Sequence, residues 1–495
     1  MPKAIPIFYS ALLLTGVNLL LRFVGTSFQV YISASLGAAG VGLLQLVLSV
    51  GSLALVAGTG GIRTAAMYLT AEELGRKKPQ NVSWVLSGCF LYSIAFSGAV
   101  ASALYLFAPA IALHWIGNMA AVEALRLFAA FLPVTCLCGV MTGYFTAANR
   151  IGTLAAVEVA EQLCSMAVTM LALTRWAGAD PGRACMSVIL GSCAGACLTL
   201  GCLVCLRLRE HPGTSPRISV GQRIAQTALP LALADVLRSG ISTTENLMVP
   251  KRLALNKAVA DPLAAFGTLS GMVFPVLMFP ACILYGLAEL LIPELARCAA
   301  GDSQVRISYL VRRSLKVAML YGMVFGGLLF LLAQPLCGRL YGSQEAGTFL
   351  QLYSLLVPML YCDAITDAMT KGLGQQKVCV RYNILTSALD VLFLYFLLPE
   401  YGMTGYFVSF TVTHALNFLL SLRRLLMITR EKLPFYIPAL SLSAAVAAVW
   451  TVSHLPGTLL RIPAYLALLF SLLYLLRIVG KEDLHWIHGL VRNKK

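Results

Sequence analysis

Charged side chains are scarce in this sequence. Only 12% of the 495 residues are Asp, Glu, Lys or Arg, whereas 59% are hydrophobic and the mean hydropathy is +0.81. Soluble proteins carry about 25% charged residues, most of them on the surface. The segment Trp84–Ala108 has no charged residue at all. Such segments would aggregate in water but have the length of a membrane-spanning helix, so the composition excludes an ordinary soluble protein.

The motifs of common enzyme classes are also missing. The sequence has no Gly-x-x-x-x-Gly-Lys-Ser/Thr phosphate loop, no His-Glu-x-x-His zinc motif and no Gly-x-Ser-x-Gly nucleophile motif. Most of the fourteen cysteines lie in or beside apolar segments, and the one Cys202-x-x-Cys205 pair has no histidine cluster nearby. No polar stretch is long enough for an ATPase domain. We therefore expect a protein that is not an enzyme and holds no metal or cofactor.

Apolar segments of membrane-spanning length recur along the whole chain. We predict an all-α membrane protein of about fourteen transmembrane helices, which lie near 7–33, 41–69, 84–107, 122–147, 153–174, 184–206, 224–249, 263–290, 317–333, 347–370, 382–399, 403–422, 434–452 and 462–476. Because transporters are commonly duplicated halves, we expect two six-helix lobes and two added helices. The predicted parts are an N-lobe 1–206, a cytoplasmic linker 207–223, a C-lobe 224–432 and a final part 433–495 with two helices and a tail.

The net charge of +16 is explained by topology. With the N-terminus in the cytoplasm, the predicted inner loops hold 26 of the 37 Lys and Arg, and the outer loops hold seven. This is the positive-inside bias of a cytoplasmic-membrane protein, and an even number of spans places both termini in the cytoplasm. The excess of positive charge therefore does not indicate a nucleic-acid partner.

Several ionisable residues fall inside predicted spans, where a charge is costly unless it faces a cavity or a partner. They are Arg22, Arg63, Glu158, Glu161, Asp235, Arg238, Glu245 and Asp390, and Asn383 lies two turns before Asp390 on the same helix face. One interpretation is structural: Asp235 and Arg238 could pair with each other, and Arg63 and Arg126 could reach an interface. The other interpretation is a cavity. Arg22, Arg63 and Arg238 would give it a positive charge that suits a pyrophosphate and repels cationic drugs.

The order and spacing of several short motifs resemble a known superfamily. The motifs are Arg22-Phe-Val-Gly25 with Gly40–Leu46, Gly143–Arg150 followed by Val157–Gln162, Asn246–Leu253, Gly271–Pro275, Ile292–Leu295, Gly405-Tyr406 and Lys481–Leu484. Together they are similar to the multidrug/oligosaccharidyl-lipid/polysaccharide exporter superfamily. Within it they resemble the polysaccharide-transport branch, which includes stage V sporulation protein B and the lipid II flippases.

This resemblance implies a V-shaped, two-lobe transporter that works by alternating access. It implies cavity arginines, for which Arg22 and Arg63 match the first two spans; span 263–290 has no charged residue before Glu289, so Arg238 would take the third place. It also implies a cation site in the second lobe, with Asp235, Asn383 and Asp390 as the candidates for Na⁺ or H⁺. Glu158, Glu161 and Glu245 receive no role from the resemblance.

These observations predict a flippase for an undecaprenyl-pyrophosphate-linked sugar in cell-wall or spore-cortex synthesis. Its partners would be the lipid-linked oligosaccharide and the membrane lipid. One rival is a cation-coupled multidrug antiporter of the same superfamily, which would have an anionic cavity. A second rival is a membrane scaffold for wall-synthesis enzymes that transports nothing, in which the charges pair structurally.

The charge distribution makes a topology prediction. A cysteine introduced into loop 207–223 should resist a membrane-impermeant thiol reagent in intact cells, because the loop faces the cytoplasm. The same residue should react once the cells are opened. Labelling in intact cells above the background of the native cysteines would contradict the predicted orientation.

Overall fold

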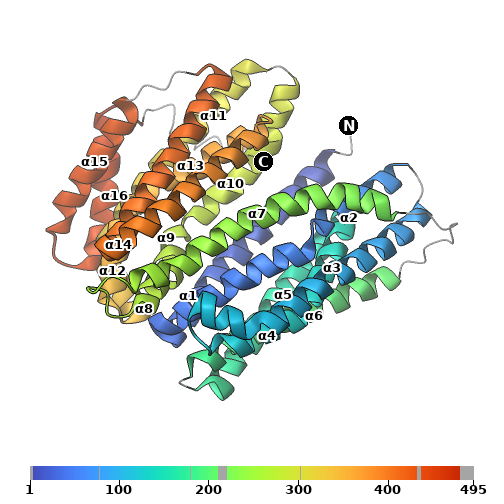
Figure 1. Ribbon diagram of the computed structural model, residues 1–495. Helices are drawn as coiled ribbons and strands as arrows, with labels where there is room; N and C mark the ends of the chain where they lie inside the picture. The colour runs from blue at the N-terminus through green and yellow to red at the C-terminus, as the bar shows by residue number, and fades with distance from the viewer. Residues whose placement is uncertain are drawn as a thin grey trace. The chain divides into compact units, whose positions relative to one another are not determined.

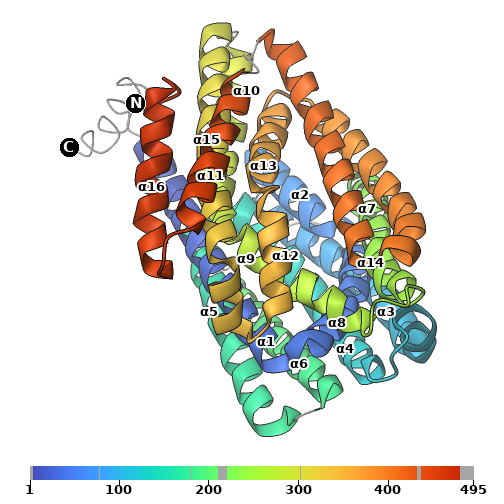
Figure 2. The ribbon, with the colours of Figure 1, turned by 90° about the vertical axis from the view of Figure 1, so that its left-hand side faces the viewer.

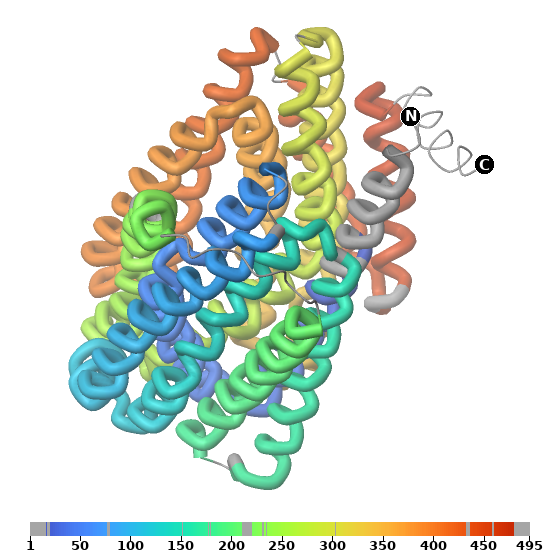
Figure 3. The backbone as a smooth tube through the Cα atoms, turned by 90° about the vertical axis from the view of Figure 1, so that its right-hand side faces the viewer, coloured from blue at the N-terminus to red at the C-terminus, as the bar shows by residue number. Residues whose placement is uncertain are grey.

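The computed structural model describes residues 4–76, 79–178, 180–209, 220–301, 303–431 and 436–479 (Figure 3). Within these ranges the chain is almost entirely helical and has no strand. Most of the linker 207–223 and the tail motif Lys481–Leu484 lie outside the described residues. The helices are α1 Ala4–Thr59, α2 Ile62–Gly75, α3 Val82–Ile111, α4 Ala121–Ala147, α5 Ile151–Ala172, α6 Pro181–Leu208, α7 Gly221–Leu253, α8 Pro262–Gly267, α9 Phe274–Met278, α10 Ala281–Ala300, α11 Gln304–Tyr341, α12 Gln344–Ser354, α13 Val357–Gly372, α14 Gln376–Thr429, α15 Tyr436–Ser453 and α16 Thr458–Leu475 (Figure 1).

The predicted all-α membrane fold is confirmed. In the part of the chain that the structure describes, eight helices are long and apolar enough to cross a membrane, and the number rises to as many as ten if each of two bent helix pairs is one span. The bends are 64° between Pro262–Met278 and Ala281–Ala300, and 58° between Gln344–Ser354 and Val357–Gly372. Pro280 and Pro358 stand at these two bends, where a proline removes a helical hydrogen bond. The predicted spans 263–290 and 347–370 are therefore bent rather than straight, and the total of fourteen stays a prediction.

Two very long helices cover more than one predicted span: α14 contains 382–399 and 403–422, and α1 contains 7–33 and the first part of 41–69, which continues into α2. In α1 the backbone leaves the helical conformation at Gly37, which has φ 68°, and in α14 it does so at Gly402, which has φ 56°. Positive φ is strained for residues with a side chain, so glycine suits both breaks. The breaks fall between the predicted spans 7–33 and 41–69 and between 382–399 and 403–422. The sequence pattern therefore located both turns.

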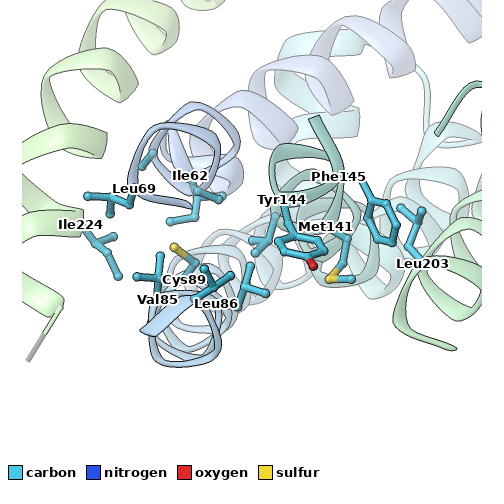
Figure 4. Close-up of a cluster of buried hydrophobic side chains, with 14 of the residues drawn as sticks. Ile62, Leu69, Val85, Leu86, Cys89, Met141, Tyr144, Phe145, Leu203 and Ile224 are labelled. Carbon is cyan, nitrogen blue, oxygen red and sulfur yellow. The ribbon is translucent and has the colours of Figure 1, made fainter. Parts of the chain in front are cut away.

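The described residues form two compact units, and the first consists of Met1–Gly271 and Val391–Gly405. In it α6 packs against α5 and α4, α3 packs against α4, and α7 packs against α1 and α2. A buried apolar cluster joins α2, α3, α4, α6 and α7 (Figure 4). Its labelled members are Ile62, Leu69, Val85, Leu86, Cys89, Met141, Tyr144, Phe145, Leu203 and Ile224. This cluster fixes α2, the helix that begins with Ile62 and Arg63.

The second unit consists of Met272–Asp390 and Tyr406–Lys495. Here α11 is the central helix, because α12, α13, α15 and α16 all pack against it (Figure 2). The phenol of Tyr465 on α16 is fully buried and donates a hydrogen bond of 2.8 Å to the carbonyl oxygen of Met323 on α11. The two units are sets of helices that pack on one another. Their existence does not show that the predicted N-lobe and C-lobe have the predicted bounds, so the lobes remain a prediction.

The contact between α16 and α11 depends on Gly327. A Cβ atom at this position would lie 2.0 Å from the Tyr465 hydroxyl, so Gly327→Ala should force the buried ring out of its place. Overpacking of this kind costs about 1–3 kcal/mol. We expect a lower melting temperature in detergent for Gly327→Ala. The matched control is Gly338→Ala on the same helix, where nothing lies within 4 Å of the added atom. Equal melting temperatures for the two variants would show that α16 docks in another way.

Candidate functional site

The first candidate site begins with Arg63 at the start of α2. Directly before it, Gly60 and Gly61 have φ 51° and 71°, so the backbone turns between α1 and α2 inside the predicted span 41–69. The Arg63 backbone packs tightly on α4, since a Cβ atom at Gly143 would lie 2.5 Å from the Arg63 carbonyl oxygen. The neighbouring Ile62 is fully buried, whereas the Arg63 side chain is exposed. A rigid backbone therefore presents an accessible guanidinium group.

The first candidate site also contains two acidic residues of α5, Glu158 and Glu161. The Glu158 carboxylate is close enough to interact electrostatically with the Arg63 guanidinium group and with Glu161. Glu161 accepts a hydrogen bond of 2.7 Å from the Thr199 hydroxyl of α6. The structure thus brings Arg63 of α2 together with Glu158 and Glu161 of α5. The sequence alone does not reveal this, because Arg63 is far from the two glutamates along the chain. Of the two carboxylates, Glu158 is the one on which Arg63 acts electrostatically.

Arg22 lies on α1, and its side chain is exposed. One turn further along α1, a Cβ atom at Gly25 would lie 3.8 Å from the amide nitrogen of Gln162, so α1 runs beside α5 at this level. Arg22 is one turn before Gly25, and Glu158 is one turn before Gln162. Of the two predicted cavity arginines, Arg63 acts electrostatically on Glu158 of α5, and Arg22 lies on α1, which runs beside α5 at Gly25.

The predicted residues of α7 are placed differently. Asp235 and Arg238 are exposed, and Glu245 is partly buried. The helix α7 is bonded to α1 through Ser49. The Thr243 hydroxyl donates a hydrogen bond of 3.0 Å to the carbonyl oxygen of Ser49, and the Asn246 amide donates one of 3.0 Å to its hydroxyl. The roles of Asp235 and Arg238 in ion and substrate binding stay predictions.

The second candidate site surrounds Asp390 in the second unit. This carboxylate is only 5% exposed and accepts hydrogen bonds from the hydroxyls of Ser409 at 2.6 Å and Thr413 at 3.0 Å. The helix α14 folds back at its break, Gly402. For this reason Ser409 and Thr413, about twenty positions after Asp390, can lie beside it. Asn383, the other predicted ligand on this helix, is partly buried two turns before Asp390. Two hydroxyls and an amide are oxygen ligands of the kind a hard cation prefers.

A second carboxylate of this unit was missed by the sequence analysis. Asp363 on α13 accepts hydrogen bonds from the side-chain amide of Asn417 at 3.2 and 3.4 Å. It falls within the predicted span 347–370, so the rule that flagged Asp390 would also have flagged Asp363. Among the described residues, no group of three or more His, Cys, Asp or Glu could hold a metal ion.

The sequence of this chain is similar to those of known proteins. Residues 8–241 match the family model of polysaccharide biosynthesis proteins. Stage V sporulation protein B of Bacillus subtilis (strain 168) is 24% identical over 413 residues, which are 80% of this chain and 78% of that protein. The sequence resemblance inferred from the short motifs is therefore confirmed.

Two solved structures share the fold. A lipid II flippase in an inward closed conformation aligns with a TM-score of 0.67 and 14% identity over 93% of this chain and 98% of its own. An inward-facing multidrug resistance transporter aligns with a TM-score of 0.63 and 15% identity over 85% of this chain and 100% of its own. The chain is thus a multi-pass membrane protein with the fold of the multidrug/oligosaccharidyl-lipid/polysaccharide exporter superfamily, and its sequence resembles the polysaccharide biosynthesis proteins of that superfamily.

Proposed function

We propose that this protein flips an undecaprenyl-pyrophosphate-linked sugar across the cytoplasmic membrane by alternating access, for wall or spore-cortex synthesis. The observation that carries the proposal is the pair of accessible arginines, Arg22 and Arg63, on neighbouring helices of the first unit. The similarity to stage V sporulation protein B and the fold shared with a lipid II flippase support it. The proposal includes cytoplasmic termini, as the charge distribution predicts.

Arginine suits a pyrophosphate for a geometric reason. Its planar guanidinium group can donate two parallel hydrogen bonds to one phosphate and keeps its charge at every physiological pH. The electrostatic contact between Arg63 and Glu158 gives the arginine a counter-ion when no substrate is bound. A pyrophosphate that takes the place of Glu158 would pair with the arginine, and the freed Glu158 carboxylate, which also meets Glu161, would then need a proton or another cation. Arg238 is the third candidate for this cavity.

We place ion coupling at Asp390. Its hydroxyl partners Ser409 and Thr413, with Asn383 nearby on the same helix, would supply neutral ligands to Na⁺ or take part in binding H⁺. Asp235 is a candidate for the same function from α7. The carboxylate of Asp390 accepts its hydrogen bonds from two hydroxyl groups, and Tyr353 and His414 are titratable groups that interact with it electrostatically, so a cation from solution can serve as its positive partner.

A cation-coupled multidrug antiporter is the second candidate function. It is favoured by the fold shared with a multidrug resistance transporter and by the acidic residues Glu158 and Glu161 of the first unit. The same reconstituted protein can decide between the two. A flippase should translocate the pyrophosphate lipid and leave a cationic dye in place, whereas an antiporter should do the reverse.

The proposal predicts the effect of removing the arginines. Arg22→Ala and Arg63→Ala should each lower the flipping rate of a fluorescent pyrophosphate-linked lipid in proteoliposomes by roughly 10–100-fold, since a hydrogen bond to a charged group contributes about 1.5–3 kcal/mol. Arg22→Lys should restore only part of the rate, because it keeps the charge but loses the planar fork. The matched control is Arg126→Ala, since Arg126 lies over the ring of Tyr105, 5.3 Å from its centre. Full complementation of a deletion strain by Arg22→Ala and Arg63→Ala would refute the role of the arginines.

A separate prediction concerns the ion. Asp390→Asn keeps the side-chain shape but removes the charge, so the variant should fold and lose the stimulation of flipping by an ion gradient. Flipping rates are compared with and without imposed Na⁺ and H⁺ gradients. Asp367→Asn is the control, because Asp367 already forms an ion pair of 2.5 Å with Lys371. If Asp390→Asn responds to the gradients as the parent protein does, the coupling ion binds elsewhere.

A further inference from the structure

Two adjacent glutamates near the end of α2 form ion pairs with an arginine in the first turn of α7. The Nη2 atom of Arg223 lies 2.7 Å from Oε2 of Glu72, and its Nη1 atom lies 2.9 Å from Oε1 of Glu73. One planar guanidinium group therefore bridges both carboxylates. The Glu73 side chain is only 2% exposed, whereas the Arg223 side chain is 31% exposed. We call Glu72, Glu73 and Arg223 the α2–α7 clasp, and all three belong to the first unit.

The same turns of α7 also make an apolar contact with α2 and α3. Val220, Ile224 and Ala228 follow each other at intervals of four residues and are all buried. A Cβ atom at Gly88 on α3 would lie 3.0 Å from the Ile224 side chain, and one at Gly61 would lie 2.5 Å from the carbonyl oxygen of Ala228. Figure 4 shows Ile224 facing the apolar side chains of α2 and α3. Because the α2–α7 clasp pairs the first turn of α7 with α2, it holds this apolar contact closed.

A second arginine already contacts the two carboxylates of the clasp. The Nη2 atom of Arg76 lies 2.5 Å from Oε1 of Glu72, and its Nη1 atom lies 3.9 Å from Oε1 of Glu73. The side-chain amide of Asn81 donates a hydrogen bond of 2.9 Å to Oε2 of Glu73. Arg76 ends α2 and Asn81 lies just before α3, so both stay beside the glutamates if α7 moves away.

This arrangement lowers the free-energy cost of separating α7 from α2. Breaking a buried ion pair is normally very unfavourable, because it leaves one buried charge without compensation. Here the buried carboxylate of Glu73 would keep Arg76 and Asn81, and the partly exposed Arg223 would gain water. The α2–α7 clasp is therefore an ion pair that can be exchanged for another one.

The two helices that the clasp joins both carry candidate substrate arginines. Arg63 lies at the start of α2, and Arg238 lies on α7, four turns after Arg223. A change in the position of α7 relative to α2 would therefore change the distance between these two arginines. Alternating access requires helices that exchange one set of contacts for another.

We propose that the α2–α7 clasp is a latch that opens and closes in each transport cycle. When it is closed, Arg223 holds the first turns of α7 on α2 and α3. When it opens, Arg223 enters water and Arg76 takes over Glu72 and Glu73. The clasp itself does not depend on the identity of the substrate, whereas its opening during transport rests on the proposed function.

The two arginines should have opposite effects on opening, although they pair with the same glutamates. Val220→Cys places a thiol where it is buried while α7 is docked, so its rate of labelling in the purified protein without substrate measures opening. In this background Arg223→Ala should speed the labelling by roughly 10–100-fold. Arg76→Ala should slow it, because the glutamates then have no second arginine to receive them. The control is Arg209→Ala, an exposed arginine at the end of α6, which should leave the rate unchanged.

A covalent link between the two helices tests whether opening is needed for transport. Gly75→Cys on α2 and Gly221→Cys on α7 add side chains at positions where nothing lies within 4 Å of the added atom. Joining the two thiols with a bifunctional maleimide should abolish flipping of the pyrophosphate-linked lipid in proteoliposomes. Each single variant treated with the same reagent should keep its rate, which controls for reaction with exposed native cysteines such as Cys202 and Cys205.

Two outcomes would overturn the proposal. If Arg76→Ala speeds labelling as Arg223→Ala does, the charges form a static brace in which every ion pair stabilises the same state. If the joined double variant flips lipid as fast as the unjoined one, transport does not need the clasp to open, although the proposed function stands. If the labelling rates change as expected but the parent protein flips no lipid, the proposed substrate is wrong and the exchangeable clasp stands.

Discussion

Hydrocarbon offers no hydrogen-bond partners, so the polar groups inside the apolar helices must find their partners within the protein. This constraint accounts first for the helices, which pair their own backbone groups. It accounts next for the hydroxyl groups inside them, many of which bond to a carbonyl one turn earlier, as Thr413 does with Ser409 at 2.9 Å. Finally, it accounts for the carboxylates, because Asp390 and Glu161 each take their hydrogen bonds from hydroxyls on another part of the chain. The carboxylates of Asp390 and Glu161 are therefore each tied to specific neighbours.

Close helix packing makes these pairings possible, and small residues permit the close packing. At Gly191 on α6, a Cβ atom would lie 1.9 Å from the hydroxyl of Thr169 on α5. One turn further along, Gly195 faces Glu161, whose carboxylate reaches Thr199 on the same helix as the glycines. Without the two glycines α5 and α6 would stand further apart, and the hydroxyl could not reach the carboxylate. Residues that carry no chemistry thus set the geometry of residues that do.

The sequence was sufficient for the features that depend on local pattern. Apolar length predicted the helices, and the breaks at Gly37 and Gly402 fall between predicted spans, whereas the turn at Gly60 interrupts the predicted span 41–69. It was also sufficient to find Arg63, Glu158 and Asp390, because a charge in an apolar segment stands out. It could not supply the partners: which hydroxyl meets Asp390 depends on the angle at which α14 folds back after Gly402, and no periodicity encodes that angle. Asp363 was missed although it is also a charge in an apolar segment, the predicted span 347–370, so the signal that found Asp390 applies to it as well.

The two units differ in the chemistry that their buried groups allow. In the first unit Arg63 already has an anion beside it in Glu158, so what can be exchanged there is the anion. In the second unit Asp390 and Asp363 are held by neutral donors, so what can be exchanged is a positive charge, whether a proton or a metal ion. A transporter that couples an anionic substrate to a cation needs both kinds of exchange. Arg22 and Arg63 belong to the first unit and Asp390 belongs to the second, so the anion and the cation of the proposed function would be bound by residues from different parts of the chain.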